Sequence, residues 1–209
     1  MVIVLREIHT VSLRRIFSRT GRYEMAKPVL LMRRSVKGKK MWYAVWVRTG
    51  HEEKVLKCCR EMLAGAESCE ECFLPKYEKA KKVNGVWIRQ KELLFPGYLF
   101  FISQNVEQLS LELKRMPEFA MILGDEEGPV PLQDKEVDFL KKYTNEDKVL
   151  EMSYGYMVGE QLVITQGPLK EYRGRVIHID RHKRRAVLEM EFFGRVVRTK
   201  VGLEVVRKL

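Results

Sequence analysis

Cysteine and histidine are the residue types in this chain with the most specific chemistry. The cysteines fall as an adjacent pair, Cys58 and Cys59, and as a C-x-x-C, Cys69 and Cys72. A zinc site needs ligands that converge tetrahedrally, and adjacent cysteines on a helix point about 100° apart, so they rarely reach one ion. The histidines show no ligand spacing. We therefore expect no metal and no cofactor, and we interpret the cysteines as reduced, buried apolar side chains of a cytoplasmic protein.

Other catalytic patterns are missing from the sequence. No paired carboxylates stand at a motif, and no glycine-rich phosphate loop follows an expected strand. No apolar run approaches the roughly 18 to 20 residues that span a membrane as a helix. The sequence therefore favours a binding protein over an enzyme, with no membrane partner and a monomeric state.

Basic residues are unevenly distributed along the chain. The net charge is +11, but residues 1–40 alone carry 11 Lys and Arg against two acids. Residues 41–154 are acidic, with 16 Lys and Arg against 20 acids, whereas residues 155–209 are basic, with 12 against 6. Because phosphate is the commonest partner of a basic surface, the last of these segments is the more informative indication of nucleic-acid binding.

The first forty residues are open to three interpretations. They are a mis-assigned translation start or a dispensable extension, with the folded protein beginning at Met41, or a basic nucleic-acid-binding arm, or a targeting peptide. Lys37-Gly38-Lys39-Lys40 is what a purine-rich ribosome-binding site would encode if it were translated. We expect 1–40 to be a basic extension outside the folded domains.

Periodicity from Met41 onward predicts a first domain over residues 41–144. Helices are expected where apolar residues recur at helical spacing, and strands where short apolar runs are bounded by turn residues. The expected helices are 51–63, 106–115 and 134–143, and the expected strands are 41–48, 71–77, 99–102 and 119–123. Asn84-Gly85 predicts a projecting hairpin. This order predicts an α+β sandwich, with an antiparallel sheet and flanking helices.

A second domain is predicted over residues 158–209, after a flexible linker at 145–157. There the period switches to alternation, with turns at Gly167-Pro168, 180–184 and Phe193-Gly194. Short strands spaced by about ten residues are typical of a small β-barrel.

Clusters of Lys and Arg at the expected hairpin ends are candidate phosphate contacts. A charged hairpin end is usually only solvated, and the Gly167-Pro168 turn has a structural interpretation too, so both interpretations stay open. Tyr172 is a candidate stacking aromatic beside them. The candidates for nucleic-acid binding are Lys81, Lys82, Lys170, Arg173, Arg175, Lys183, Arg184 and Arg185.

Residues 41–209 resemble the NusG family of transcription factors. The shared tags of the first domain are Trp42-Tyr43, Gly50, Leu74-Pro75, Phe95-Pro96-Gly97-Tyr98, Pro117, Gly124 and Pro131 to Val137. Those of the second domain are Gly159-Glu160, Gly167-Pro168-Leu169, Gly174 and Phe193-Gly194-Arg195, which resemble a KOW motif. The resemblance implies an NGN-type α/β sandwich followed by a small SH3-like β-barrel with a KOW motif.

Family membership would also imply binding sites. Tyr43, Phe95, Pro96 and Tyr98 would frame an apolar cavity for the clamp helices of the large subunit of RNA polymerase. Asn105 and Gln108 would face the opposite side of the polymerase cleft. Arg48, Lys54 and Lys57 would approach exposed DNA, although a lysine stripe on a helix is more often only solvent-facing.

The implied function is transcription elongation with suppression of pausing and termination. The basic hairpin ends resemble those of the LoaP branch, whose members are antiterminators that recognise an RNA hairpin. Two alternatives remain, a housekeeping factor that couples to a ribosomal protein or a termination factor, and an RNA-binding KOW protein that acts without polymerase.

Overall fold

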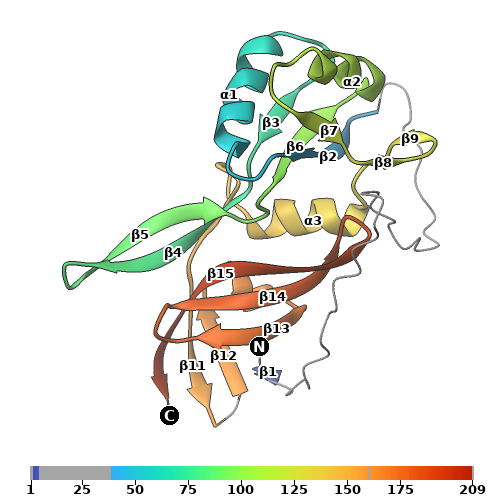
Figure 1. Ribbon diagram of the computed structural model, residues 1–209. Helices are drawn as coiled ribbons and strands as arrows, with labels where there is room; N and C mark the ends of the chain where they lie inside the picture. The colour runs from blue at the N-terminus through green and yellow to red at the C-terminus, as the bar shows by residue number, and fades with distance from the viewer. Residues whose placement is uncertain (1, 5–38, 160, 209) are drawn as a thin grey trace, which may run out of the picture.

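The computed structural model describes residues 2–4, 39–159 and 161–208. Its N-terminal domain is built on a sheet with strand order β3-β6-β2-β7, which α1 and α2 cover on one face (Figure 1). The elements are β2 (Met41–Val47), α1 (Glu52–Met62), β3 (Glu71–Phe73), β6 (Tyr98–Ser103), α2 (Val106–Lys114), β7 (Ala120–Ile122) and α3 (Asp134–Tyr143), with a small ribbon of β8 (Gly124–Asp125) and β9 (Gly128–Pro129). The expected helices are confirmed to within a residue or two.

The helix starts show why these boundaries were predictable. Asn105 caps α2 by accepting a hydrogen bond from the Gln108 backbone N at 3.2 Å. Before α3, the backbone N of Gln133 donates to the Glu136 carboxylate at 2.7 Å. Both contacts satisfy backbone groups that a helix end leaves without a partner in the helix, so they fix where each helix begins.

A long basic hairpin leaves this domain beside the sheet. It consists of β4 (Lys76–Val83) and β5 (Val86–Leu93), and Asn84 and Gly85 form its turn with φ values of 49° and 83°. Positive φ at both positions is what a tight two-residue hairpin turn needs. The single strand expected at 71–77 is in fact two, because the chain turns at Leu74-Pro75 and β4 joins a different sheet from β3.

The segment expected to be a flexible linker is largely ordered. Within it, β10 (Val149–Leu150) pairs in parallel with Lys76 and Tyr77 of β4, and Leu150 is fully buried. The next strand, β11, already begins at Ser153. Only Glu151 and Met152 therefore lie between the last strand of one domain and the first of the next.

The C-terminal β-domain (153–208) is a curved sheet with strand order β1-β12-β11-β15-β14-β13. Its strands are β11 (Ser153–Val158), β12 (Gln161–Gln166), β13 (Arg175–Asp180), β14 (Arg185–Phe192) and β15 (Arg195–Lys208), with a 3-10 turn η1 (Pro168–Glu171). The strand β15 is long enough to pair with both β14 and β11, so the sheet curls around a core of Leu162, Leu188 and Leu203. The predicted fold class, an α/β sandwich followed by a small β-rich domain, is confirmed.

Residues 2–4 form β1 (Val2–Val4), which pairs antiparallel with Gln161 to Val163 of β12. The remainder of the predicted N-terminal extension, residues 5–38, lies outside the described residues. The three interpretations of that extension therefore stay predictions.

Two hydrophobic cores lie on the two faces of the N-terminal sheet. One contains Val55, Leu99 and Leu109 and is closed by α1 and α2. The other contains Phe95 and Phe100 and continues without interruption into Leu188 and Phe192 of the β-domain. The β-domain, together with α3, thus packs on the second face of the N-terminal sheet (Figure 1).

Candidate functional site

The aromatic residues on the second face of the N-terminal sheet meet those of the β14–β15 turn. We call Trp42, Phe95, Tyr98 and Phe100 the aromatic face. Phe95 is only 3% exposed, and its ring lies 4.6 Å from that of Phe192. The ring of Phe193 stacks on Tyr98 at 4.5 Å. Phe95 and Tyr98, which were expected to bind polymerase, are therefore grouped, but the β-domain covers Phe95 and part of Tyr98.

Polar contacts hold the same junction. The Thr199 hydroxyl donates to the Leu94 carbonyl at 2.5 Å, and Arg195 donates to the Tyr98 hydroxyl at 2.7 Å. Lys135 pairs with Glu191 at the rim. The Thr199 hydroxyl and the Leu94 carbonyl are buried and hydrogen-bonded to each other, so neither loses a partner when water is excluded. The junction between the two domains therefore resembles a specific interface more than a loose contact.

Glu136 links α3 to the β-domain. Among the described residues, it is the one buried carboxylate that does so. It is 3% exposed and accepts a hydrogen bond from the Phe193 backbone N at 2.5 Å, in addition to the bond from Gln133. Burial raises the pKa of this carboxyl above its ordinary value, although the two backbone hydrogen bonds oppose the shift. Protonation of Glu136 therefore favours the folded state.

This shift predicts a pH dependence of stability. A carboxyl with a raised pKa stabilises the folded state fully below its ordinary value of 4.5 and loses that contribution as pH rises through the raised value. We expect the free energy of unfolding of the wild type to fall, relative to Glu136→Gln, as pH increases from about 4.5 to about 7.5 in urea titrations. The control is Glu191→Gln, whose exposed carboxyl has a lowered pKa because of Lys135 and should show no trend in this range. A constant difference for Glu136→Gln would contradict the prediction.

Tyr43 does not belong to the aromatic face. It is 1% exposed and packs with Met41 and Val106 on the helix-covered side of the sheet. Successive strand residues point to opposite faces, so its neighbour Trp42 is the one that faces the β-domain side, where its ring lies 5.4 Å from Phe73. The expectation that Tyr43 lies with Phe95 and Tyr98 is therefore wrong, because Trp42 and not Tyr43 is on their side of the sheet.

The other predicted contacts of the N-terminal domain are exposed. Pro96 lies at the surface of the FPGY turn, and Asn105 and Gln108 lie at the exposed start of α2. The Asn105 side chain accepts the capping hydrogen bond from the Gln108 backbone N. The Gln108 side chain donates to Glu112 at 3.0 Å. They remain predicted contacts.

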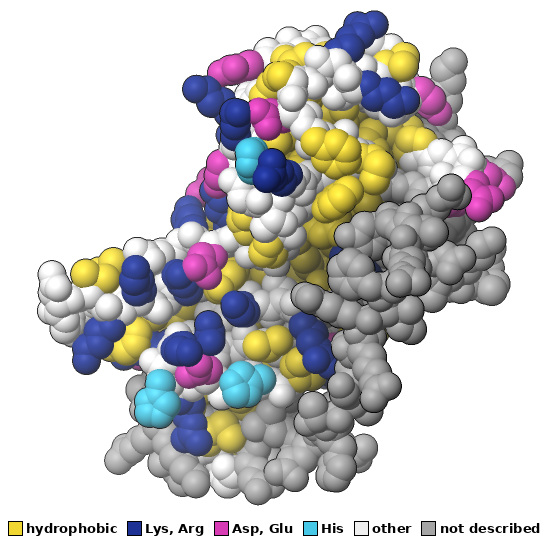
Figure 2. Space-filling model, viewed as in Figure 1, with side chains coloured by type: hydrophobic (Ala, Val, Ile, Leu, Met, Phe, Trp, Pro, Cys, Tyr) yellow, Lys and Arg dark blue, Asp and Glu magenta, His cyan; other side chains and the backbone are white. Residues whose placement is uncertain are grey.

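An apolar strip continues the aromatic face beyond the edge of the β-domain. Trp46, Phe119 and Met121 are 36%, 55% and 48% exposed, and the Trp46 and Phe119 rings meet edge to face at 5.4 Å. Trp46 pairs with Met121 across β2 and β7. Exposed hydrophobic side chains gather on this part of the N-terminal domain in Figure 2. Sequence reasoning missed this strip, although the alternation along β2 placed Trp46 on the same face as Trp42.

Lysine and arginine side chains form a second candidate site, which crosses from the hairpin to the β-domain. The guanidinium of Arg184 lies 3.9 Å from the centre of the Trp87 ring, which joins the two elements. Figure 2 shows Lys and Arg side chains along the hairpin and on the β-domain next to it. The residues that we call the basic surface are Lys82, Trp87, Arg181 and Arg184. Lys81 and Ile88 form the neighbouring cross-strand pair of the hairpin, so Lys81 points to its opposite face.

Several cations in and next to the basic surface make no ion pair among the described residues. No carboxylate oxygen there lies within 4 Å of Lys81, Lys82 or Arg181, and all three side chains are exposed. Sequence reasoning missed Arg181, and it missed Trp87 as the aromatic member.

The remaining predicted nucleic-acid contacts divide into paired and unpaired cations. Lys54 pairs with Glu118 and Lys57 with Glu61, which favours the solvent-facing interpretation of that helix stripe. Acidic neighbours also partner four predicted cations of the β-domain, namely Arg175, Lys183, Arg184 and Arg185. Arg48, Lys170 and Arg173 are exposed, with no ion pair among the described residues.

Tyr172 is not available as a stacking aromatic. It is 4% exposed and packs against Phe139 and Tyr143, and burial raises the pKa of its hydroxyl to about 12. A Cβ at Gly174 would lie 2.3 Å from that hydroxyl, so the glycine of the KOW-like loop is needed for core packing. The aromatic side chain that does lie beside the basic residues is Trp87, under the Arg184 guanidinium.

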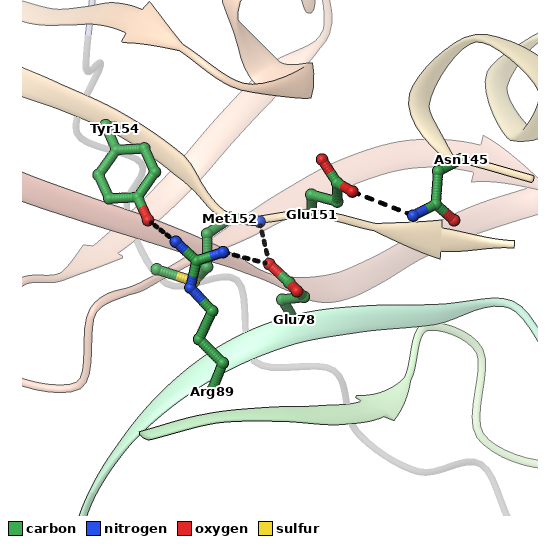
Figure 3. Close-up of polar contacts among 6 residues, drawn as sticks. All are labelled: Glu78, Arg89, Asn145, Glu151, Met152 and Tyr154. Atoms are coloured by element: carbon green, nitrogen blue, oxygen red, sulfur yellow. Dashed lines mark hydrogen bonds and ion pairs between the residues drawn. The ribbon is translucent and has the colours of Figure 1, made fainter. Parts of the chain in front are cut away.

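The root of the hairpin contacts β11 through a small polar cluster. Figure 3 shows the Arg89 guanidinium between the Glu78 carboxylate and the Tyr154 hydroxyl. Arg89 lies 3.4 Å from Glu78 and 2.5 Å from Tyr154, and the Met152 backbone N donates to Glu78 at 3.1 Å. These contacts fix the hairpin against the β-domain and so hold the two halves of the basic surface together.

Gly202 permits this close approach. A Cβ there would lie 2.3 Å from the Glu78 carbonyl oxygen and 2.2 Å from the Met152 sulfur. We expect Gly202→Ala to push the hairpin from the β-domain and to lower the free energy of unfolding by about 1–3 kcal/mol, the usual effect of overpacking. Urea unfolding and hydrogen exchange of the β4 amides would measure both effects. Val196→Ala, at a side chain 63% exposed on the same strand, is the control and should change stability by less than about 0.5 kcal/mol.

Two features were looked for among the described residues, a cluster of metal-binding side chains and a membrane-spanning helix. Within them no group of three or more Cys, His, Asp or Glu side chains is placed to hold a metal ion. Nor is any helix in that part of the chain long and apolar enough to cross a membrane.

Comparison with known proteins shows a family resemblance. Residues 40–141, which carry the N-terminal sheet, α1, α2, most of α3 and the FPGY segment, match the family model described as transcription termination factor nusG. Over this domain the chain is similar to the NusG family. It is 28% identical over 176 residues to the transcription termination/antitermination protein NusG of Vibrio vulnificus, covering 82% of this chain and 97% of that protein. It is 26% identical to the protein of that name from Rickettsia felis, covering 83% and 93%.

A solved structure of the NusG family is also similar to this chain. Described as domain interaction in Thermotoga maritima NusG, it aligns with a TM-score of 0.46 and 22% identity, covering 80% of this chain and 94% of that one. The match to the NusG family model ends at residue 141, so the aromatic face and the hairpin residues of the basic surface lie inside the matched region, and Arg181 and Arg184 of the β-domain lie outside it.

Proposed function

We propose that this chain is a transcription elongation factor that binds RNA polymerase through the aromatic face and the apolar strip beside it. The observation that carries the proposal is the concentration of aromatic side chains on one face of the NusG-matched sheet, from Trp42 through Phe95 to Phe100. Buried aromatic anchors supply most of the energy at protein interfaces, and an amphipathic helix pair is the kind of partner that such a face fits. The relatives' name, termination/antitermination protein, supports a role in transcription.

In this proposal the arrangement described is a resting form. Phe192 and Phe193 lie on the aromatic face, so polymerase binding requires the β-domain to move away. Trp46, Phe119 and Met121 stay accessible and are a first contact for polymerase before that movement. The fraction of molecules in which the β-domain has left the aromatic face then sets the apparent affinity for polymerase.

Phe193 gives a direct test of this arrangement. It is half-buried, and alanine in its place would remove the stack on Tyr98 without touching the aromatic face itself. We expect Phe193→Ala to bind core polymerase about tenfold more tightly than the wild type, because a loss of about 1.4 kcal/mol in docking raises the open fraction by that factor. Tyr98→Ala is the matched variant on the other side of the same stack, and it should bind more weakly. Equal binding by all three proteins in co-precipitation with core polymerase would contradict the proposal.

We further propose that the protein suppresses pausing and termination, and that RNA is the ligand of the basic surface. Exposed unpaired cations beside an aromatic ring suit a phosphate backbone with an unstacked base. This combination favours the specialised, LoaP-like type of factor over a housekeeping factor that couples to a ribosomal protein or a termination factor. Single-round transcription on a terminator template, with and without candidate leader RNA, tests this. Readthrough that stays unchanged on every template would disprove antitermination and leave polymerase binding to be judged separately by co-precipitation.

A further inference from the structure

The two halves of the basic surface belong to different domains. Lys82 and Trp87 are cross-strand partners on one face of the β4–β5 hairpin, which leaves the N-terminal domain. Arg181 and Arg184 lie in the turn between β13 and β14 of the β-domain, where the Arg184 backbone N donates to the Arg181 carbonyl at 3.3 Å. The basic surface is therefore complete only while the β-domain is docked on the N-terminal domain.

Arg184 is the side chain that joins the two halves. Its guanidinium lies 3.9 Å from the centre of the Trp87 ring and also pairs with Glu204 of β15 at 3.0 Å. The Leu203 backbone N donates to the Arg184 carbonyl at 3.1 Å, which fixes the turn against β15. Because the guanidinium and the turn are both held, the cations of the turn keep a defined position relative to the hairpin.

Each half contributes one cation that makes no ion pair in the described part of the chain. These cations are Lys82 of the hairpin and Arg181 of the turn. Within the turn, Asp180 pairs with Lys183 at 3.8 Å and with Arg185 at 3.5 Å. A phosphate backbone that lies across the junction neutralises both unpaired cations, whereas a ligand of one half leaves the other cation without a partner.

Strand β14 connects this turn to the contacts on the aromatic face. Arg184 immediately precedes β14, and Phe192 and Phe193, which pack on Phe95 and Tyr98, lie at its other end. A strand of eight residues spans about 25 Å, at about 3.3 Å for each residue. Coupling between the basic surface and the aromatic face therefore passes through the docking of the β-domain and not through a shared contact.

We propose that RNA on the basic surface holds the β-domain against the aromatic face, so that RNA and polymerase oppose each other's binding to this chain. The inference rests on the proposed function, which supplies both ligands. RNA that contacts both halves binds the docked form more tightly than a form in which the hairpin and the turn are apart, and it shifts the population toward the docked form. Polymerase binds the form in which the β-domain has left the aromatic face. Because the two ligands select different forms, each weakens the binding of the other.

The Phe193 backbone amide reports the docking directly. It donates to the Glu136 carboxylate at 2.5 Å across the junction, so its hydrogen exchanges with solvent when the β-domain undocks. We expect a hairpin RNA with an unpaired loop, at about 100 times its dissociation constant, to slow exchange of this amide by about 100-fold in NMR spectra. The Leu109 amide, which donates to the Asn105 carbonyl at the start of α2, is the internal control and should keep its rate.

Two neighbouring lysines give matched variants for this measurement. Lys82→Gln removes the hairpin cation of the basic surface, whereas Lys81→Gln removes the adjacent cation, which points to the opposite face of the hairpin. At RNA concentrations that saturate each variant, the slowing should be several-fold smaller in Lys82→Gln and unchanged in Lys81→Gln. If fluorescence anisotropy shows bound RNA but the Phe193 amide of the wild type does not slow, the inference is overturned and RNA binding stands. Absence of RNA binding would overturn the proposed RNA ligand as well.

Co-precipitation with core polymerase measures the coupling itself. With the same RNA at about ten times its dissociation constant, we expect the wild type to bind polymerase about tenfold more weakly, and polymerase to weaken RNA binding in turn. Lys82→Gln should respond much less. Polymerase affinity that RNA leaves unchanged or increases would mean that the basic surface survives undocking, against the inference. RNA that acted by occupying polymerase itself would weaken the wild type and Lys82→Gln equally, and that result would also overturn it.

Discussion

Replacing Phe95 by alanine is expected to lower the free energy of unfolding by about 3–5 kcal/mol, the usual range for deleting a buried phenylalanine. The ring is 3% exposed and lies within 6 Å of the rings of Phe100, Phe192 and Phe193. Its loss would leave a cavity at the junction of the two domains, where the core of one continues into the core of the other. Urea unfolding measures the change.

A neighbouring position provides the control for this variant. Pro96→Ala changes an exposed residue of the same turn and should alter stability by less than about 1 kcal/mol. If Phe95→Ala were as mild as Pro96→Ala, the two domains would not share a core in solution. A further readout is hydrogen exchange at β14, which should rise in Phe95→Ala together with exchange at β6.

Reversing two charges of the basic surface, Lys82→Glu with Arg181→Glu, is expected to weaken RNA binding by about 10- to 100-fold at about 0.1 M salt. The two residues come from different domains and have no acidic partner among the described residues, so the change acts on the ligand with little effect on internal ion pairs. The slope of log affinity against log salt should also fall by about 0.7–0.9 for each phosphate that the variant no longer neutralises. Fluorescence anisotropy with a labelled hairpin RNA measures both the affinity and its salt dependence.

The matched control has the same change in net charge at another place. Lys114→Glu with Arg115→Glu alters two exposed cations at the end of α2, which lies at the opposite end of the N-terminal domain from the hairpin tip (Figure 1). If RNA binding depends only on net charge, both double variants lose affinity equally. That outcome would argue against a localised basic surface.

Local sequence patterns were enough to predict most of the secondary structure. Asn105 at a helix start, Glu136 three residues after Gln133, and the Asn84-Gly85 turn each make contacts with near neighbours in the chain, so their effect is visible in the sequence. The fold class followed from the order of these elements. The position of Pro75, which divides one expected strand into two, was the clearest local signal that was overlooked.

The candidate sites were harder to predict, because they depend on which face each side chain takes and on how the domains pack. Tyr43 and Trp42 are adjacent in sequence but lie on opposite sides of the sheet. Choosing Tyr43 therefore put a residue of the helix-covered core in place of Trp42, which belongs to the aromatic face. The burial of Tyr172 and the contact of Arg184 with Trp87 both involve segments far apart in the chain. Alternation within one strand contains no information about such partners.

The pairing of β10 with β4 determines how far the β-domain can travel. With only Glu151 and Met152 free between β10 and β11, the tether spans about 7 Å, since an extended residue covers about 3.3–3.6 Å. If β10 detaches from β4, the tether grows to residues 144–152 and its reach to about 30 Å. The β-domain can therefore leave the aromatic face while β10 stays paired with β4, and detachment of β10 is a separate step. A ligand that keeps β10 paired with β4 would let the β-domain rotate but would keep it within about 7 Å of its docked position.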